Sequence, residues 1–248
     1  MANKVSVVDL SHWDTVTDYA KVKAAGVTGI IYKATQGASS QDATYNDARI
    51  KALRAGLRWG AYHFGDNSDV RLQAANFLSF AQIDEDSLFV LDYEPYSGAQ
   101  MNITQAKAWM MQVETGLSRE GESILYSGNL IKEDLGSRKD PFFGARRLWL
   151  AQYGNTPVVQ VSWENYWLWQ FSGDGEGPEP HTVDGISGNC DCSSYAGTAE
   201  ALNDEWAHGI VVPPTPAPPA SSLVTITIDA PPDVEVKVVY LNPKTSLS

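Results

Sequence analysis

Short apolar runs alternate with amphipathic segments over the first half of the chain. The apolar runs have the length and β-branched content of buried strands, while the amphipathic segments repeat apolar residues with helical spacing. Gly26 and Gly56 follow the first two amphipathic segments, where glycine is a common helix C-cap. The predicted strands are 5–10, 29–34, 57–64, 88–93 and 123–127, and the predicted helices are 17–25, 42–55, 70–80, 104–117, opened by a Thr104 cap, and a short one after Asn129.

This alternation predicts a barrel that begins regularly and closes irregularly. Five strand–helix units in succession indicate a parallel sheet, because right-handed crossovers place the helices outside it. Residues 148–153, 166–171 and 189–192 also have strand patterns, but only loops join them, and helical spacing returns at 198–207. We therefore predict an α/β fold, a modified TIM-like barrel of five βα units closed by three strands that lack helices.

A proline-rich stretch separates this region from the end of the chain. Residues 211–220 read Val-Val-Pro-Pro-Thr-Pro-Ala-Pro-Pro-Ala, the composition of a semi-rigid linker. Beyond it, two alternating segments around an Ala-Pro-Pro-Asp turn predict one β-hairpin, too small to be stable alone. The role of this tail is open, and self-association is one role it could serve. The predicted domains are a barrel at 1–209, a linker at 210–222 and a hairpin tail at 223–248.

Composition and charge exclude several classes of partner and site. The net charge of −12 repels phosphate backbones, so we expect no nucleic-acid partner. No apolar run approaches the ~20 residues that span a bilayer, so no membrane insertion is expected. Cys190 and Cys192 are expected to be two small buried side chains, because a bridge between them would be strained. His12 and His63 lack the spacing of metal ligands, so we expect neither a metal nor a cofactor.

Carboxyl groups stand where a β/α barrel carries its chemistry, at the ends of predicted strands. Asp9 ends the first strand, Asp92 and Glu94 stand at the end of the fourth, and Asp191 lies in the last. Because Asp92 and Glu94 are two positions apart on a strand, both leave the same face, with Cβ atoms roughly 6–7 Å apart. Two like charges at this distance raise the pKa of one of the two carboxyls, which leaves one proton donor and one ionised carboxylate. Glycoside hydrolysis requires both groups. The alternative is that Asp92 and Glu94 are an acidic pair on the surface with no catalytic role.

Other side chains near the strand ends are candidate contacts for a substrate. The chain has 8 Trp and 11 Tyr, and flat aromatic faces suit carbohydrate clefts although most such rings are core. Of these we select Tyr62 and Tyr126 as cleft residues. Lys33 ends the second strand, where it could form a buried ion pair with Asp9 or Asp92 or contact substrate.

Five separated motifs appear in order and together resemble one enzyme family. They are Asp9-Leu10-Ser11-His12-Trp13, Tyr32-Lys33-Ala34-Thr35-Gln36-Gly37, Gly60-Ala61-Tyr62-His63-Phe64, Leu91-Asp92-Tyr93-Glu94 and Gly185-Ile186-Ser187-Gly188-Asn189-Cys190-Asp191. In this order they resemble the Chalaropsis-type lysozymes, glycoside hydrolase family 25, common among bacteriophage endolysins. The resemblance covers about residues 5–206, and that family's barrel has five βα units closed by three helix-free strands, as the pattern above also predicts.

The resemblance implies an N-acetylmuramidase, a lysozyme that hydrolyses the β-1,4 bond from N-acetylmuramic acid to N-acetylglucosamine in bacterial peptidoglycan. It implies that Glu94 is the general acid, Asp92 its partner carboxylate, and Asp9 and Asp191 flanking acids that position water or substrate. Retention through attack by the substrate's own 2-acetamido group is the leading hypothesis. The outcome stays open, because the Cβ estimate lies between the carboxyl separations of about 5–5.5 Å for retention and about 6.5–9.5 Å for inversion.

Departures from the family and two rival functions remain. Gln36 stands where the family usually has Glu, and Cys190 and Cys192 stand where aliphatic residues are usual, but no carboxylate is lost.

One rival function is that of a chitinase-like hydrolase, whose signature has alternating aspartates where Phe89 and Val90 stand here. The other is a barrel that binds wall glycans without cutting them. No secretory signal pattern is visible, which favours an endolysin kept in the host bacterial cytoplasm until its release to the wall, or a virion-associated lysozyme.

Overall fold

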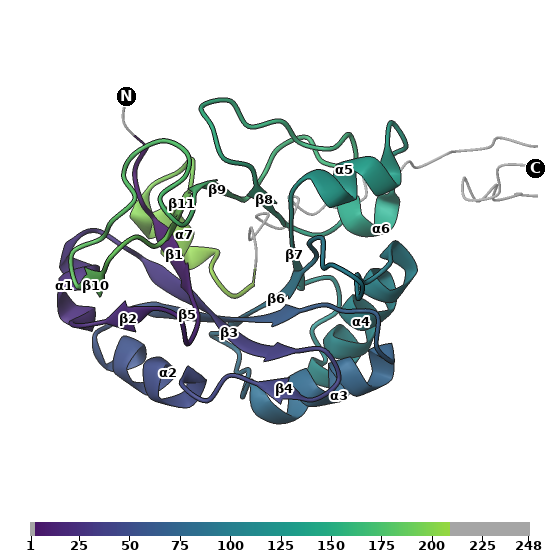
Figure 1. The fold of residues 1–248 in the computed structure, drawn as a ribbon, viewed down its shortest axis with the longest axis horizontal. Helices are drawn as coiled ribbons and strands as arrows, with labels where there is room; N and C mark the ends of the chain where they lie inside the picture. The colour runs from purple at the N-terminus through teal and green to yellow at the C-terminus, as the bar shows by residue number, and fades with distance from the viewer. Residues whose placement is uncertain (1–2, 209–248) are drawn as a thin grey trace, which may run out of the picture. The chain divides into compact units, whose positions relative to one another are not determined.

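The barrel predicted from the sequence is present in the computed structural model, which describes residues 3–208 (Figure 1). One sheet of 9 strands runs in the order β1-β11-β9-β8-β7-β6-β5-β3-β4, and a pairing of β1 with β3 closes it. Within the described residues β4 (Ser40–Gln41) pairs with β3 alone, so eight strands form the closed barrel. They are β1 (Val7–Leu10), β3 (Gly29–Gln36), β5 (Arg58–Phe64), β6 (Leu88–Asp92), β7 (Ile124–Ser127), β8 (Leu148–Ala151), β9 (Leu168–Ser172) and β11 (Asp191–Ser194).

The fold class is confirmed, including the closure by strands that no long helix connects. The predicted linker 210–222 and hairpin tail 223–248 lie outside the described residues. The domain division therefore stays a prediction.

One strand of the barrel runs against the others. The pairings from β1 through β3, β5, β6, β7, β8 and β9 are all parallel, whereas β11 is antiparallel to both β9 and β1. A loop connection allows this reversal, while a parallel return would need a longer crossover. Because β11 is reversed, its first residue lies at the same barrel end as the last residues of the parallel strands, and the register pairs Asp9 with Asp191.

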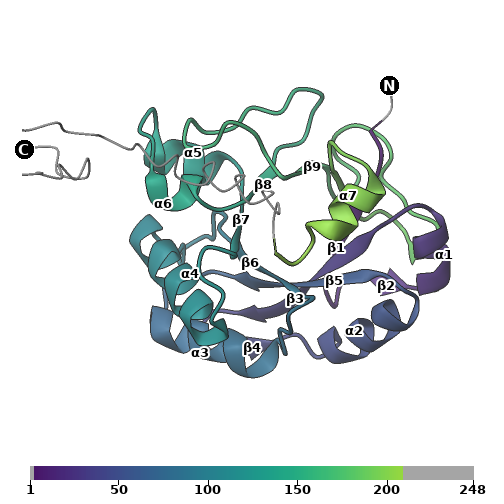
Figure 2. The same cartoon turned by 180° about the vertical axis from the view of Figure 1, so that it is seen from behind.

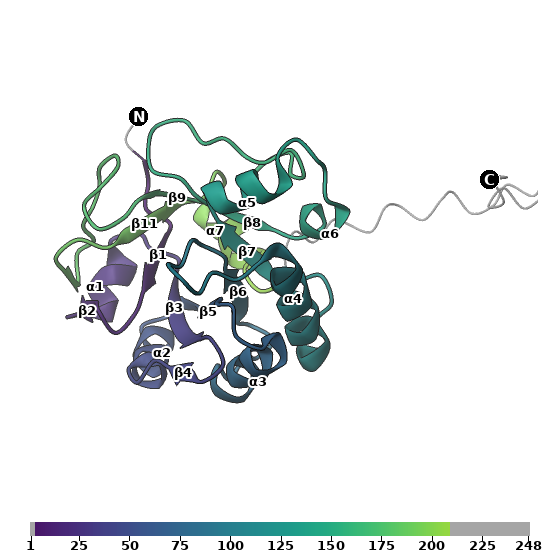
Figure 3. The same ribbon diagram turned by 45° about the vertical axis from the view of Figure 1, so that its right-hand side comes forward.

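The helices lie around the outside of the strands, as the end-on view shows for α1 to α4 (Figure 3). Helix α7 lies near the start of β1 on the opposite side from α2 and α3 (Figure 2). No helix in residues 3–208 has the length and apolar content to cross a membrane. The helices are α1 (Tyr19–Ala24), α2 (Tyr45–Arg54), α3 (Val70–Phe80), α4 (Ile103–Leu117), α5 (Asn129–Leu135), α6 (Pro141–Gly144) and α7 (Ala199–Asp204), and a small second sheet pairs β2 (Thr15–Val16) with β10 (Ile186–Ser187).

The start of α4 differs from the prediction. Asn102, not Thr104, is the N-cap, and its side chain accepts hydrogen bonds from the backbone N–H groups of Thr104 and Gln105. The Gln105 side chain accepts in return from the Asn102 N–H at 3.0 Å, which completes a capping box. These reciprocal bonds satisfy three backbone donors at once, so they outcompete a cap two residues later. The short helix α6, capped by Asp140, was not predicted.

Alternation along β6 divides the core into two parts. Leu88 and Val90 pack inside the barrel with Ile31, Trp149 and Trp206 among others. Phe89 and Leu91 point the other way and pack against the surrounding helices. Period-two alternation therefore directs positions 88, 90, 92 and 94 toward the barrel axis.

The two cysteines are unbridged and buried, as expected. Cys190 is 2% and Cys192 0% exposed, and their sulfur atoms lie 3.9 Å apart. Both therefore act as small core side chains on either side of Asp191.

Candidate active site

The carboxyl pair arises where the apolar inner face of β6 reaches the end of the barrel. Leu88 and Val90 fill the interior, and the next two positions of the same face are Asp92 and Glu94. Tyr93 lies between them, fully buried in the outer core. The pair is thus held by a strand whose five residues, 88–92, are all buried.

A cavity of about 190 Å³ opens at this end of the barrel, and all seven predicted site residues line it. They come from β1, β3, β5, β6 with its following loop, β7 and β11, each near the end that faces the cavity. The predicted set is Asp9, Lys33, Tyr62, Asp92, Glu94, Tyr126 and Asp191, and the remaining wall is Ser11, Trp13, Phe64 and Trp149. Trp13, which we did not select, is 83% exposed at the rim. Its place in the first motif was the only signal in the sequence.

Burial sets the protonation of the central pair. Asp92 is 6% exposed, and among the described residues its Oδ1 has no hydrogen-bond partner. Burial, followed by the charge of Glu94, raises the pKa of Asp92 well above its usual range, and Lys33 offsets part of this rise. Burial, followed by the charge of Asp191, raises the pKa of Glu94 to about 7. Because the two groups interact, they titrate as a unit, and near neutral pH the pair retains a proton for transfer.

Asp9 and Asp191 form a second acidic pair across the β1–β11 register. Burial and then the charge of Asp191 raise the pKa of Asp9. Burial and then the charge of Asp174 raise the pKa of Asp191 to about 6. The Asp174 backbone N–H donates to Asp191 Oδ1 at 3.0 Å, which holds the second carboxyl in place.

Gln170 connects the acids to the aromatic wall, and sequence reasoning did not find it. Its Nε2 donates to both carboxylate oxygens of Asp9 at 3.0 Å, while its Oε1 accepts from the Tyr126 hydroxyl at 2.7 Å. Gln170 is 0% exposed. One buried amide therefore orients an acid and a phenol that belong to distant parts of the chain. The only signal in the sequence was a glutamine at an inward position of an otherwise apolar strand.

Lys33 does not form the ion pair that we considered. Its Nζ donates to Gln36 Oε1 at 2.7 Å and lies 5.1 Å from the centre of the Phe64 ring. No ion pair in residues 3–208 joins Lys33 to Asp9 or Asp92. Because Gln36 is a neutral acceptor, the charge of Lys33 has no carboxylate at contact distance among the described residues and acts on Asp92 only through space.

The two histidines near the site have structural partners. His12 Nδ1 lies 2.8 Å from Asp42 Oδ2. His63 is buried between Thr35 and Gln73, at 2.7 and 3.0 Å, and burial lowers its pKa to about 4. Across the described part of the chain, no three His, Cys, Asp or Glu side chains are placed to hold a metal ion.

Two further hollows share walls with the central cavity and extend it. One, of about 320 Å³, shares Lys33 and continues along His12, Gln36 and Asp42 among others. The other, of about 370 Å³, shares Glu94 and Tyr126 and continues along the residues Asn129, Gln152, Tyr153 and Gln170 among others. The carboxyl pair therefore stands in the middle of a groove that is open on both sides, which suits cleavage within a polymer.

The family model of glycosyl hydrolases family 25 matches residues 8–179, more than half of the chain. The chain belongs to glycosyl hydrolase family 25. The matched span contains Asp9, Asp92 and Glu94, whereas Asp191 lies beyond it. For Asp191 the supporting observation is its pairing with Asp9 in the barrel.

Individual relatives with the name lysozyme agree with this assignment. Lysozyme M1 of Streptomyces globisporus is 28% identical over 217 residues, which cover 80% of this chain and 70% of that protein. An autolytic lysozyme of Clostridium acetobutylicum is 28% identical over 209 residues, 83% of this chain but 56% of its own length. The crystal structure of a lysozyme from Streptomyces coelicolor is 27% identical, with a TM-score of 0.72 over 84% of this chain and 99% of that one. The predicted enzyme class, a glycoside hydrolase of the lysozyme type, is confirmed.

Proposed function

We propose that this family 25 hydrolase is an N-acetylmuramidase that cleaves the β-1,4 bond between N-acetylmuramic acid and N-acetylglucosamine in bacterial peptidoglycan. The observation that carries the proposal is the pair of buried Asp92 and partly buried Glu94, with raised pKa values, at the middle of an open groove. The names of the relatives, lysozymes from Streptomyces and Clostridium, support the choice of substrate.

In the first step Glu94 acts as general acid. Its pKa of about 7 keeps much of the carboxyl protonated at neutral pH, ready to transfer a proton to the glycosidic oxygen. As that oxygen leaves with the bonding electrons, positive charge develops at the anomeric carbon. The pair shares one proton, and in the reactive form Glu94 carries it while Asp92, on the same face of β6, is the anion that stabilises this charge.

The second step proceeds by substrate assistance with retention. The 2-acetamido oxygen attacks the anomeric carbon from the face opposite the leaving group, and Asp92 accepts the acetamido N–H to orient it. Glu94, now ionised, removes a proton from the incoming water, which opens the cyclic intermediate and restores the original configuration. Asp9 and Asp191, held by Gln170 and Asp174, position water or substrate.

Wall clearing by purified protein tests the activity, with Glu94→Gln as the paired variant. We expect the wild type to clear bacterial walls and release reducing ends of N-acetylmuramic acid, and the folded variant to do neither. Walls of several types left intact by the wild type would favour the binding barrel. Release of N-acetylglucosamine oligomers from chitin, with walls untouched, would favour the chitinase-like alternative.

The configuration of the first product tests the second step. Proton NMR of a digest, recorded before mutarotation, should show the β anomer of the new reducing end. The α anomer as first product would contradict substrate assistance and indicate inversion.

The biological setting predicted from the sequence, a bacteriophage endolysin, stays a prediction. Immunodetection in host lysates and in purified phage particles would test it. We expect signal in the lysate alone, and signal in particles would favour a virion-associated lysozyme.

A further inference from the structure

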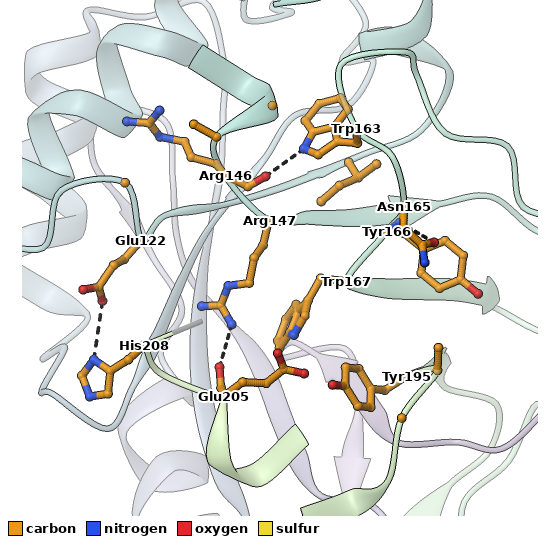
Figure 4. Close-up of a pocket in the computed structure, with 16 residues that line it drawn as sticks. Glu122, Arg146, Arg147, Trp163, Asn165, Tyr166, Trp167, Tyr195, Glu205 and His208 are labelled. Carbon is orange, nitrogen blue, oxygen red and sulfur yellow. Dashed lines mark hydrogen bonds and ion pairs between the residues drawn. The ribbon is translucent and has the colours of Figure 1, made fainter. Parts of the chain in front are cut away.

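A larger hollow, of about 540 Å³, lies at the opposite end of the barrel from the catalytic groove (Figure 4). We call it the base pocket. Arg146 and Arg147, just before β8, and Trp167, just before β9, contribute to its wall, and Glu205 enters from the end of α7. These are the amino-terminal ends of the parallel strands, whereas the carboxyl pair follows the C-terminal end of β6. No residue of the base pocket lines the groove.

Aromatic rings form much of the wall of the base pocket. Trp163 and Trp167 are each 7% exposed, while Tyr166 and Tyr195 are partly buried. The Trp163 indole N–H donates to the Arg146 carbonyl at 2.8 Å, so its orientation is defined by the backbone. The Arg147 guanidinium lies over the Trp167 ring at 4.4 Å, so the partly exposed rings of Tyr166 and Tyr195 are the ones that offer apolar faces to a ligand, at little entropic cost.

Polar atoms without partners lie among these rings. Within residues 3–208, Arg147 Nη2 has no hydrogen-bond partner, while Trp167 lies close enough to Glu205 to lower the pKa of that carboxyl without a well-formed hydrogen bond between Nε1 and Oε1. Glu205 is 8% exposed, and Figure 4 shows its side chain reaching toward Trp167 and Tyr195. Burial raises the pKa of Glu205 and lowers that of Arg147 to about 10. An unpaired buried polar group costs about 1–3 kcal/mol, so a ligand that pairs these atoms would gain by relieving that cost.

The charges around the base pocket are balanced, which favours an uncharged ligand. Arg146 pairs with Glu114 at 2.5 Å and Glu122 with Arg119 at 2.8 Å. Arg147 and Glu205 remain, one of each sign. A neutral ligand with both hydrogen-bond donors and acceptors and an apolar face would match this wall better than an ion of either sign.

We propose that the base pocket is a second glycan-binding site that holds one or two neutral N-acetylhexosamine units. The ring face of such a sugar would pack on the Tyr166 and Tyr195 side chains, its acetamido carbonyl would accept from Arg147 or Trp167, and a hydroxyl or amide N–H would donate to Glu205. That the glycan is the wall polymer rests on the proposed function. Occupied together with the groove, this site would hold the enzyme on its substrate between cuts.

Indole NMR signals can report the two ends of the barrel separately. The full chain carrying Glu94→Gln, which blocks hydrolysis, would be titrated with tri-N-acetylchitotriose and followed by the ¹H–¹⁵N signals of the tryptophan indoles. Trp163 and Trp167 report the base pocket, and Trp13 and Trp149 report the groove. We expect saturable shifts of Trp163 and Trp167. Their failure to move would overturn the proposal.

Two substitutions in the same background test the site itself. Tyr195→Ala removes one aromatic face and should weaken binding at the Trp167 signal about tenfold, the effect of losing roughly 1.4 kcal/mol. Ala196→Trp, at an exposed lining position, should block the pocket without touching the core. Leu72→Ala, an exposed apolar side chain on α3, is the matched control and should change nothing. Equal titrations in all three variants would contradict a site in this pocket.

The two proposals can fail independently. If the base pocket signals shift but the wild type cuts no wall, the proposed function is wrong and the glycan site stands. If walls are cut but these signals stay still, the glycan site is wrong. A response to a wall stem peptide, with none to the sugar, would replace the glycan with a peptide ligand and also overturn the inference.

Discussion

At the scale of single residues, the Glu94 carboxyl controls how activity depends on pH. Burial raises its pKa to about 7, and the acid step needs its protonated form. We therefore expect the rate of wall clearing to fall above about pH 7, approaching tenfold per pH unit, when measured by turbidity between pH 5 and 9. A rate that stays level up to pH 9 would show that Glu94 is not the acid whose proton is transferred.

Gln170 is a positioning residue whose substitution should affect kcat more than KM. Gln170→Leu leaves Asp9 without its amide donor and Tyr126 without its acceptor, and each unpaired buried group costs about 1–3 kcal/mol. We expect kcat on a soluble glycan to fall about tenfold or more. Since the amide lowers the pKa of Asp9, any limb of the pH profile that Asp9 sets should also move to higher pH. Tyr126→Phe, which breaks only the second bond, should retain the position of that limb, and identical profiles for all three proteins would refute the role.

At the scale of elements, β3 lies in tight contact with Trp206, a ring that helps to fill the base of the barrel. A Cβ on Gly29 would lie 2.4 Å from the ring of Trp206, whose indole N–H is held by the Trp59 carbonyl at 2.9 Å. A buried ring held in this way cannot move aside cheaply. We expect Gly29→Ala to lower the free energy of unfolding by about 1–3 kcal/mol, measured by urea denaturation.

The same substitution elsewhere provides the control. Gly116→Ala in α4 would meet only the end of the Leu78 side chain, which can rotate, and alanine is the better helix former. This variant should be neutral or more stable than the wild type. Equal losses at both glycines would mean that the contact with Trp206 is not the cause.

At the scale of the whole molecule, the site acids couple stability to pH. Burial raises the pKa of Asp9, Asp92, Glu94 and Asp191, whereas carboxyls in the unfolded chain titrate at about 4. Between about pH 4 and 7 the folded state thus binds more protons than the unfolded state, so stability falls as pH rises through this window. We expect a higher unfolding midpoint at pH 5 than at pH 7 by calorimetry, and a smaller difference in Glu94→Gln.

Other groups define the control for this measurement. His63 makes stability rise with pH, because burial lowers its pKa to about 4. It is a single group, whereas four carboxyls make stability fall as pH rises. Asp140, whose pKa is lowered by hydrogen bonds and by Lys107 despite burial, loses its contribution only on acidification below about pH 4. Asp140→Asn should therefore destabilise the protein at pH 5 and 7 alike. Midpoints that rise from pH 5 to 7 in the wild type would contradict the assignment of the site acids.

The local pattern of the chain was sufficient to predict the parallel part of the barrel and the centre of the site. Strand periodicity and capping are short-range properties, so 88–93 was predicted as a buried strand, with Asp92 and Glu94 as two carboxyls on one face at its end. The same reasoning failed where two local signals competed, as at the start of α4. There the reciprocal bonds of Asn102 and Gln105 decided the cap.

The sequence by itself therefore determined the fold class, the place of the carboxyl pair and seven of the eleven side chains that line the cavity, because these follow from period, order and strand ends. Only the tertiary structure decided the reversed direction of β11, the partner of Lys33 and the bond from Gln170 to Asp9. Gln170 and Asp9 are 161 positions apart, and their contact exists only once the barrel closes. The base pocket likewise depends on closure, because its walls come from loops and strand beginnings that no local pattern brings together.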